Sequence, residues 1–311
     1  MMHRRLALLL GAVSLLVGAC ASRPETAAGP PAPGEGGIGG TGAIAGWADA
    51  GVFGTVTGVG SIDVNGLRIV IPAALRPESL PDLLPAGRVA VGETVAVAAG
   101  REDGETVARR LVKVRPLVGP VSYVAPDRRG LAVMRTPVLL DESAPALAEL
   151  AADDWVAVSG LWRDGAVIAS RVDRVPPQAT ASISGLLRGA GSARAVGATE
   201  VDLSCCAADA PAGFVAVAGR YRGGRLVAER VASGAAALFP PGVDRLVVEA
   251  FLARNPDDDG YHLSGFGIPM DPASSVPPVV GRRSVFVGRY DGSFLIEGSY
   301  PAPRAGGPSA R

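Results

Sequence analysis

Alternating hydrophobic and polar residues form four similar pairs of short segments along this chain. Each pair has an apolar segment, a turn containing Asp-Gly or Gly-Gly, and a second apolar segment. The pairs lie at residues 95–111, 156–172, 215–231 and, more loosely, 285–296. Alternation with a period of two is typical of half-buried strands, and these turn dipeptides favour the positive φ angles of tight hairpins. The pattern therefore predicts four related β-hairpins.

The spacing of the hairpins indicates the size of a repeating unit. Their second turn residues are Gly104, Gly165, Gly224 and Gly292, roughly sixty residues apart, a period that suits a small five-stranded domain.

The second unit has the clearest order of elements. It predicts strands near 117–124, 131–135 and 137–140, a short helix over 143–152, and strands at 155–162 and 166–174. Three strands, a helix and a final hairpin is the order of an OB-type barrel. We therefore predict an all-β fold of about four tandem, five-stranded OB-like barrels. The expected units are 47–116, 117–177, 178–240 and a divergent 241–303, followed by a disordered tail at 304–311.

The N-terminus has a basic head followed by an apolar run, residues 6–20, that is short for a membrane span. The run ends in Val17-Gly18-Ala19-Cys20, which resembles the lipobox of bacterial lipoproteins. The resemblance implies that residues 1–19 are a signal peptide and that Cys20 carries a lipid anchor. The alternative is an ordinary secretory signal with a cysteine at that place by chance.

Residues 20–46 are rich in Gly, Pro and Ala and cannot bury enough apolar surface to fold alone, so we expect a flexible tether. Ala21 and Ser22 follow the cysteine, and no aspartate stands there. By resemblance to lipoprotein sorting in Gram-negative bacteria, this favours the outer membrane, with the protein facing the periplasm.

Residues 51–66, GVFGTVTGVGSIDVNG, resemble the opening of a domain-of-unknown-function family found in bacterial envelope lipoproteins. Members of that family repeat OB-like barrels after a lipobox. The resemblance covers about 51–115 and weakens through the later units. It implies a fold and a location, and it carries no activity.

Composition narrows the chemistry. The chain has 30 basic and 30 acidic side chains and only two histidines, His3 and His262. A balanced charge does not favour nucleic-acid binding, which needs a concentrated basic surface. With His3 in the signal peptide and no nucleophile motif, most hydrolase and metalloenzyme designs are disfavoured. We assign no catalytic residues and no cofactor.

Arginine and aromatic residues recur at the last hairpin of each unit. Exposed rings and guanidinium groups of OB barrels can stack on sugars or bases, which makes these residues the candidate ligand face. The alternative is that hairpin edges carry such residues for packing. The candidates are Arg101, Trp162, Arg163, Tyr221, Arg222, Arg289 and Tyr290.

Cys205 and Cys206 are adjacent, and neighbours on a strand point to opposite faces, so they do not easily share one metal ion. In an oxidising envelope they are a possible disulfide or a packed structural pair.

Residues 255–260 place Asn255, Asp257 and Asp259 at the first, third and fifth positions of a calcium loop, with Gly260 sixth. Phe266 stands where a calcium loop needs its bidentate glutamate. A turn between strands at 246–252 and 261–267 also explains these residues.

These observations predict a lipid-anchored envelope protein that acts as a non-catalytic binding or scaffolding module. Its expected partners are the membrane and an envelope protein or polymer. A small-ligand or calcium-binding protein is the alternative, and an enzyme acting on envelope glycans is the least favoured.

The lipobox gives a direct prediction. Replacing Cys20→Ser removes the only thiol at the cleavage site, so the protein should leave the membrane fraction or persist as an uncleaved precursor. Cell fractionation and the mass of the mature chain measure this. A mature, acylated Cys20→Ser product would contradict the lipobox.

Overall fold

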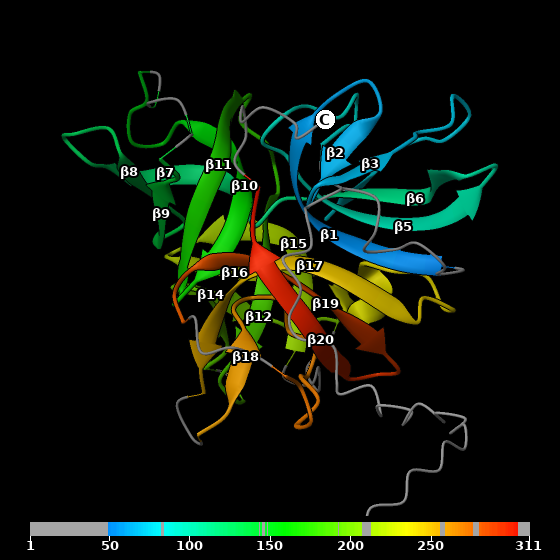
Figure 1. Ribbon diagram of the computed structural model, residues 1–311. Helices are drawn as coiled ribbons and strands as arrows, with labels where there is room; N and C mark the ends of the chain where they lie inside the picture. Colours follow the sequence, from blue (N-terminus) through cyan, green and yellow to red (C-terminus); the bar gives the residue numbers. More distant parts are fainter. Residues whose placement is uncertain are drawn as a thin grey trace, which may run out of the picture. The chain divides into compact units, whose positions relative to one another are not determined.

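The computed structural model describes residues 49–81, 84–142, 144, 147, 149–191, 193–206, 213–255, 259–275 and 280–303. All of them belong to one compact unit, Gly39–Arg311. Cys20, the predicted tether and the predicted tail lie outside the described residues. The described part is almost entirely β-structure, with one short 3-10 helix, η2 (Ala235–Ala237) (Figure 1). None of the described segments forms an apolar helix of membrane-spanning length.

The second barrel is a closed ring of five strands. They are β7 (Leu117–Val124), β8 (Gly130–Val133), β9 (Thr136–Leu140), β10 (Trp155–Arg163) and β11 (Ala166–Val175). Pairing runs β7-β8-β9-β11-β10 and returns to β7, with β9 and β11 parallel and the other pairs antiparallel. This is the OB-type order that the sequence predicts.

The third barrel repeats this ring. Its strands are β12 (Ala181–Arg188), β13 (Ala195–Val196), β14 (Thr199–Asp202), β15 (Gly213–Arg222) and β16 (Arg225–Ser233). The third and fifth strands, β14 and β16, are again the parallel pair, and β15 closes the ring on β12.

The first barrel closes less completely. Its strands are β1 (Asp49–Gly58), β2 (Ile62–Val64), β3 (Leu67–Ile69), β5 (Thr94–Glu102) and β6 (Glu105–Val114), and the additional β4 (Glu78–Leu80) pairs with β6. A single parallel bridge between Val70 and Val107 joins the end of β3 to β6. Backbone hydrogen bonds of Val70 to Thr106 and Ala108 support that bridge.

The fourth barrel is the most divergent. It has β17 (Arg245–Arg254), β18 (Tyr261–Leu263), β19 (Arg283–Tyr290) and β20 (Phe294–Pro301). A parallel bridge between Met270 and Phe294 stands where the other barrels have their third strand beside the fifth. The predicted all-β fold of tandem OB-like barrels is confirmed.

The final hairpin of every barrel has a β-bulge at the corresponding place. The register shifts at Ala98/Ala99, Ser159/Gly160, Ala218/Gly219 and Val287/Gly288. At Gly219 a Cβ atom would lie 1.9 Å from the carbonyl oxygen of Val227, so only glycine fits there. The bulge bends these long hairpins so that they can close a small barrel.

The short helix predicted over 143–152 is wrong for the residues that the structure describes there. Ala144, Leu147 and the described positions from 149 to 152 lie in bends, turns or irregular backbone. Ala144 and Leu147 are buried by these irregular turns.

The barrels pair through their first strands. In the first and fourth barrels, β1 and β17 pair in parallel, with Val52 opposite Val247 (Figure 1). In the second and third barrels, β7 and β12 pair antiparallel, with Val118 opposite Ser182. Two ten-stranded sheets result, each shared by two barrels.

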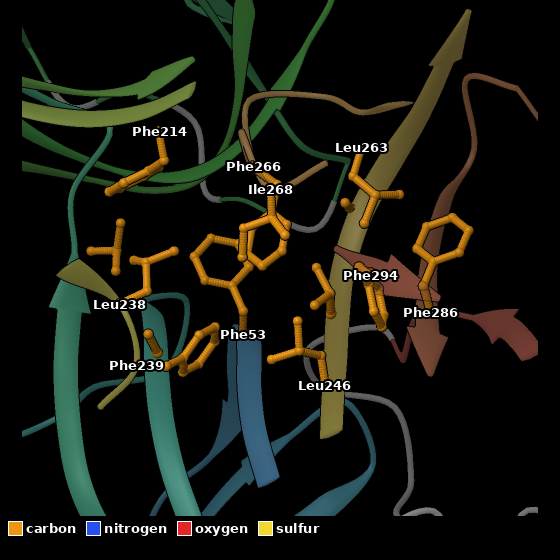
Figure 2. Close-up of a cluster of buried hydrophobic side chains, with 14 of the residues drawn as sticks. Phe53, Phe214, Leu238, Phe239, Leu246, Leu263, Phe266, Ile268, Phe286 and Phe294 are labelled. Atoms are coloured by element: carbon orange, nitrogen blue, oxygen red, sulfur yellow. The ribbon is translucent and has the colours of Figure 1, made fainter. Parts of the chain in front are cut away.

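A single hydrophobic cluster receives side chains from all four barrels. Figure 2 shows Phe53 of β1 pointing into it beside Phe266, and the two ring centroids are 5.2 Å apart. Leu161 of β10, Phe214 of β15 and Phe294 of β20 belong to the same cluster. We call this cluster the shared core. Because every barrel contributes side chains to it, the barrels are packed against one another and are not independent domains.

The shared core predicts cooperative unfolding. Phe294 is fully buried in it, so Phe294→Ala should lower the free energy of unfolding by about 3–5 kcal/mol. The whole transition should shift as one, in denaturant titrations followed by circular dichroism and by tryptophan fluorescence.

Val59 is 59% exposed, and the control Val59→Ala should change the free energy of unfolding by less than about 0.5 kcal/mol. Separate transitions, with only one displaced by Phe294→Ala, would show that the barrels unfold independently.

Candidate functional site

The candidate ligand residues do not form one site, because they lie on the final hairpins of four different barrels. Arg101 is on β5, Trp162 and Arg163 on β10, Tyr221 and Arg222 on β15, and Arg289 and Tyr290 on β19.

Trp162 is buried, so its prediction as part of an exposed ligand face is wrong. Its side chain is only 8% exposed, and its Nε1 donates a hydrogen bond to the carbonyl of Ser184 at 2.8 Å. Gly185, Gly197 and Gly265 lie against the ring so closely that a Cβ atom on any of them would clash with it. Trp162 therefore holds the second barrel against the third and fourth.

The other hairpin residues are engaged locally or exposed singly. The Arg163 guanidinium lies 5.4 Å from the centroid of the Phe251 ring, a cation–π contact with the fourth barrel. Arg289 Nε pairs with Glu297 at 2.9 Å within its own hairpin. Tyr221 and Tyr290 are half-buried, and burial raises the pKa of each hydroxyl. Edge packing accounts for these contacts.

Cys205 and Cys206 form a disulfide directly after β14. Both are exposed, and the backbone N–H of Cys206 donates to the carbonyl of Leu203 at 3.1 Å, which closes a turn.

The predicted calcium loop joins β17 to β18. Asn255 and Asp259 are described, whereas Asp257 lies outside the described residues. The Asn255 side-chain oxygen lies 2.9 Å from Nδ1 of His262, and its backbone N–H donates to Gly260 at 2.9 Å. Among the described side chains, no group of three His, Cys, Asp or Glu residues is placed to hold a metal ion. The calcium loop stays a prediction.

His262 lies on β18, and its Nε2 atom is buried with no hydrogen-bond partner among the described residues. Burial lowers the pKa of His262 below its usual 6.5, and nearby Arg188 lowers it further, against an opposing effect of Asp164. These neighbours come from the third and second barrels, so the imidazole lies where three barrels meet.

An exposed apolar surface covers the outer side of the second barrel. Tyr123 of β7 is opposite Ala132 of β8, which is opposite Pro137 of β9, and Leu139 follows on β9. Tyr123 is 57% exposed and Leu139 43%, and Pro137 is also exposed. We call these four residues the β7–β9 face.

A β-bulge creates this face. Regular alternation would turn Tyr123 to the same side as the buried Val121, but the register shifts between them. The bulge therefore re-aims the Tyr123 ring toward solvent. This is why the sequence pattern alone did not single it out.

Arginine residues stand in the chain at both ends of β8, the central strand of the β7–β9 face. Arg128 precedes β8 and Arg135 follows it, and both are exposed with φ angles of 53° and 72°. Few residues other than glycine adopt such angles without a stabilising context. Arg129 beside them is held by the carbonyl of Asp141 at 2.8 Å. The face thus has an apolar centre and a basic margin.

Comparison with known families places this face within a recognised domain. Residues 119–173 match the family model of DUF5666, a domain of unknown function. The domain covers nearly all of the second barrel and lies downstream of the 51–115 segment, whose motif predicts such a family. Searches of curated proteins and of solved structures found no significant match.

His262 makes a pH prediction. Unfolded histidine takes up a proton near pH 6.5 and the folded side chain only at lower pH, so the unfolded chain binds more protons in between. Stability should therefore fall as the pH drops below about 6.5. Denaturant unfolding at pH 7.5 and pH 5 should show a smaller fall for His262→Gln than for wild type. Identical falls would contradict the assigned role of His262.

Proposed function

We propose that this protein is a lipid-anchored component of the cell envelope, held by Cys20, that acts as a non-catalytic module binding a partner protein through the β7–β9 face. The apolar run ending in Val17-Gly18-Ala19-Cys20 supports the anchor. Periplasmic exposure at the outer membrane is part of the proposal.

The observation that carries the proposal is the exposure of Tyr123 on β7 and Leu139 on β9, the two strands that flank β8 in the DUF5666 domain. Inward neighbours Leu131 and Val138 are buried, so the outward side chains are not needed to fill the barrel. Protein-binding surfaces characteristically combine an aromatic anchor with surrounding apolar contacts and arginine.

The margin of the face indicates the chemistry of the partner. Arg135 follows β8 with an exposed side chain, and guanidinium groups pair with carboxylates in a geometry of two parallel hydrogen bonds. We therefore expect an apolar patch bordered by Asp or Glu side chains on the partner protein.

Pairing of the buried carboxylates supports a non-catalytic role. Glu93 accepts hydrogen bonds from Lys113 Nζ at 2.9 Å and from the backbone of Ala90 at 2.9 Å. Glu249 is held by Arg283 and by the backbone N–H of Thr55. Both carboxylates thus have structural partners within the barrels.

Site-specific photo-cross-linking in intact cells tests the proposal. A photo-reactive residue in place of Tyr123 in the full chain should give one defined protein adduct. The matched control is Val227, which is 39% exposed on β16 of the third barrel. No adduct, or the same adduct at 123 and 227, would contradict the proposed face.

The cross-linked protein, once purified, should bind the full chain directly. Leu139→Asp places a carboxylate in the apolar centre and should weaken this binding at least about tenfold. An unchanged melting temperature would show that the variant is folded. Unaltered binding by folded Leu139→Asp would place the contact elsewhere.

A further inference from the structure

A second surface feature of the DUF5666 barrel is an open groove where β10 begins and β11 ends. Its volume is about 360 Å³, within the range of small-molecule sites. The groove is lined by Asp153, Asp154, Trp155, Arg174, Val175, Pro176 and Pro177.

Trp155 provides the apolar wall. It is paired with Val175 on one side and Pro120 on the other, and it packs against the core of the second barrel. It remains partly exposed and lines the groove, next to the exposed Pro176 and Pro177. An aromatic ring fixed by its own barrel is a rigid platform for a flat, weakly polar ligand surface.

Arg174 and Asp154 provide an oriented donor. Arg174 Nη2 donates to Asp154 Oδ1 at 2.5 Å, and the other oxygen of Asp154 accepts from the backbone of Ala151 at 2.9 Å. The Ala151 hydrogen bond, followed by Arg174, holds the pKa of Asp154 below its usual value. Asp154 therefore orients the guanidinium, whose remaining N–H groups border the groove.

Asp153 provides an acceptor. Its backbone has φ of 69°, the left-handed region that favours glycine, and its N–H donates to the carbonyl of Val121 at 2.9 Å. Holding a residue other than glycine there costs about 1 kcal/mol or more. Its side chain is exposed at the groove, and no ion pair of Asp153 is recorded within the described residues.

We propose that this groove binds an uncharged saccharide unit. A sugar ring has an apolar C–H face, which suits Trp155 and the prolines, and hydroxyl groups that both donate and accept hydrogen bonds. Asp153 accepts and Arg174 donates, so both roles of a hydroxyl are met. The groove holds two carboxylates and one guanidinium, which disfavours an anion. A cation would leave the Arg174 donor unused, whereas a neutral polyol uses both the donor and the acceptor.

The inference does not depend on the proposed protein partner. It uses different residues of the second barrel, so a failure of the β7–β9 face would leave the groove untouched.

Tryptophan fluorescence of the full-length chain in detergent micelles tests the groove, with maltotriose and tri-N-acetylglucosamine as the probes. A saccharide stacked on Trp155 should change the emission saturably and protect it from acrylamide quenching. Trp155→Phe should abolish most of that change, because Trp162 is buried and does not line the groove. Trp47→Phe, at the third tryptophan of the chain, should leave the change in place.

Two polar variants and one matched control complete the test. Asp153→Asn and Arg174→Gln should each weaken binding at least about tenfold, because each removes a charge-assisted hydrogen bond. Asp164→Asn is the control, since Asp164 also has a positive φ, 50°, in the same barrel but does not line the groove. It should bind within about twofold of wild type.

Several outcomes would overturn the inference. They are no response to either saccharide, binding indifferent to Asp153→Asn, or a response to tetramethylammonium alone that requires Asp153. The last would identify a cation site instead.

Discussion

Close packing of phenylalanine rings where the four barrels meet is the constraint on which the rest of this structure depends. The shared core joins inward residues of the fourth barrel, such as Phe286 and Phe294, to side chains from the outer walls of the other three, so those barrels must present an apolar outer wall as well as an apolar inside. Small residues make that approach possible. Gly51 and Gly265 stand where a Cβ atom would clash with Phe239 and Trp162, respectively. Some of the glycines in this chain are therefore needed for close packing between barrels, and others for the positive φ angles of turns.

Buried charged side chains fix the orientation in which the barrels pack. Glu249 of the fourth barrel accepts a hydrogen bond from Thr55 of the first at 2.6 Å, and Arg283 bridges Glu249 to Asp141 of the second. Removing one member would leave the others buried and unpaired, which is strongly destabilising. Gly54 belongs to the same arrangement, because a Cβ atom there would lie 2.9 Å from Oε2 of Glu249. Apolar packing holds the barrels together, and these polar contacts specify one orientation.

Local chemistry was predictable from the sequence because turns and alternation are local. Asp103-Gly104, Asp164-Gly165 and Gly223-Gly224 all have positive φ angles, as hairpin dipeptides of this kind favour. The helix predicted over 143–152 is wrong for the described residues of that segment, where Ala144 and Leu147 are buried in irregular backbone and turns. The prediction that Trp162 belongs to an exposed ligand face was wrong for a different reason. The residues that cover its ring come from the third and fourth barrels, and the spacing within one hairpin does not reveal them.

The candidate sites show the same limit. A single exposed tyrosine or leucine on a strand is ordinary, so the sequence did not identify Tyr123 and Leu139 as part of a binding surface. Their importance depends on a bulge that turns the Tyr123 ring outward and on three paired strands that place both residues on the same outer side of the barrel. The sequence predicts a turn or a helix end at Asp153 and Asp154. Only the pairing of β10 with β11 brings Arg174 and Trp155 to the same groove.

Pairing of β1 with β17 can form only late in the synthesis of the chain. The backbone hydrogen bond from Thr55 to Glu249 joins residues that are 194 positions apart in the sequence. At usual rates of synthesis, roughly ten seconds or more separate the two. During that interval the first barrel has an open strand edge and an uncovered Phe53, both of which invite pairing with other chains. We therefore expect this chain to remain unfolded, or to be bound by a chaperone, until its fourth barrel has been synthesised.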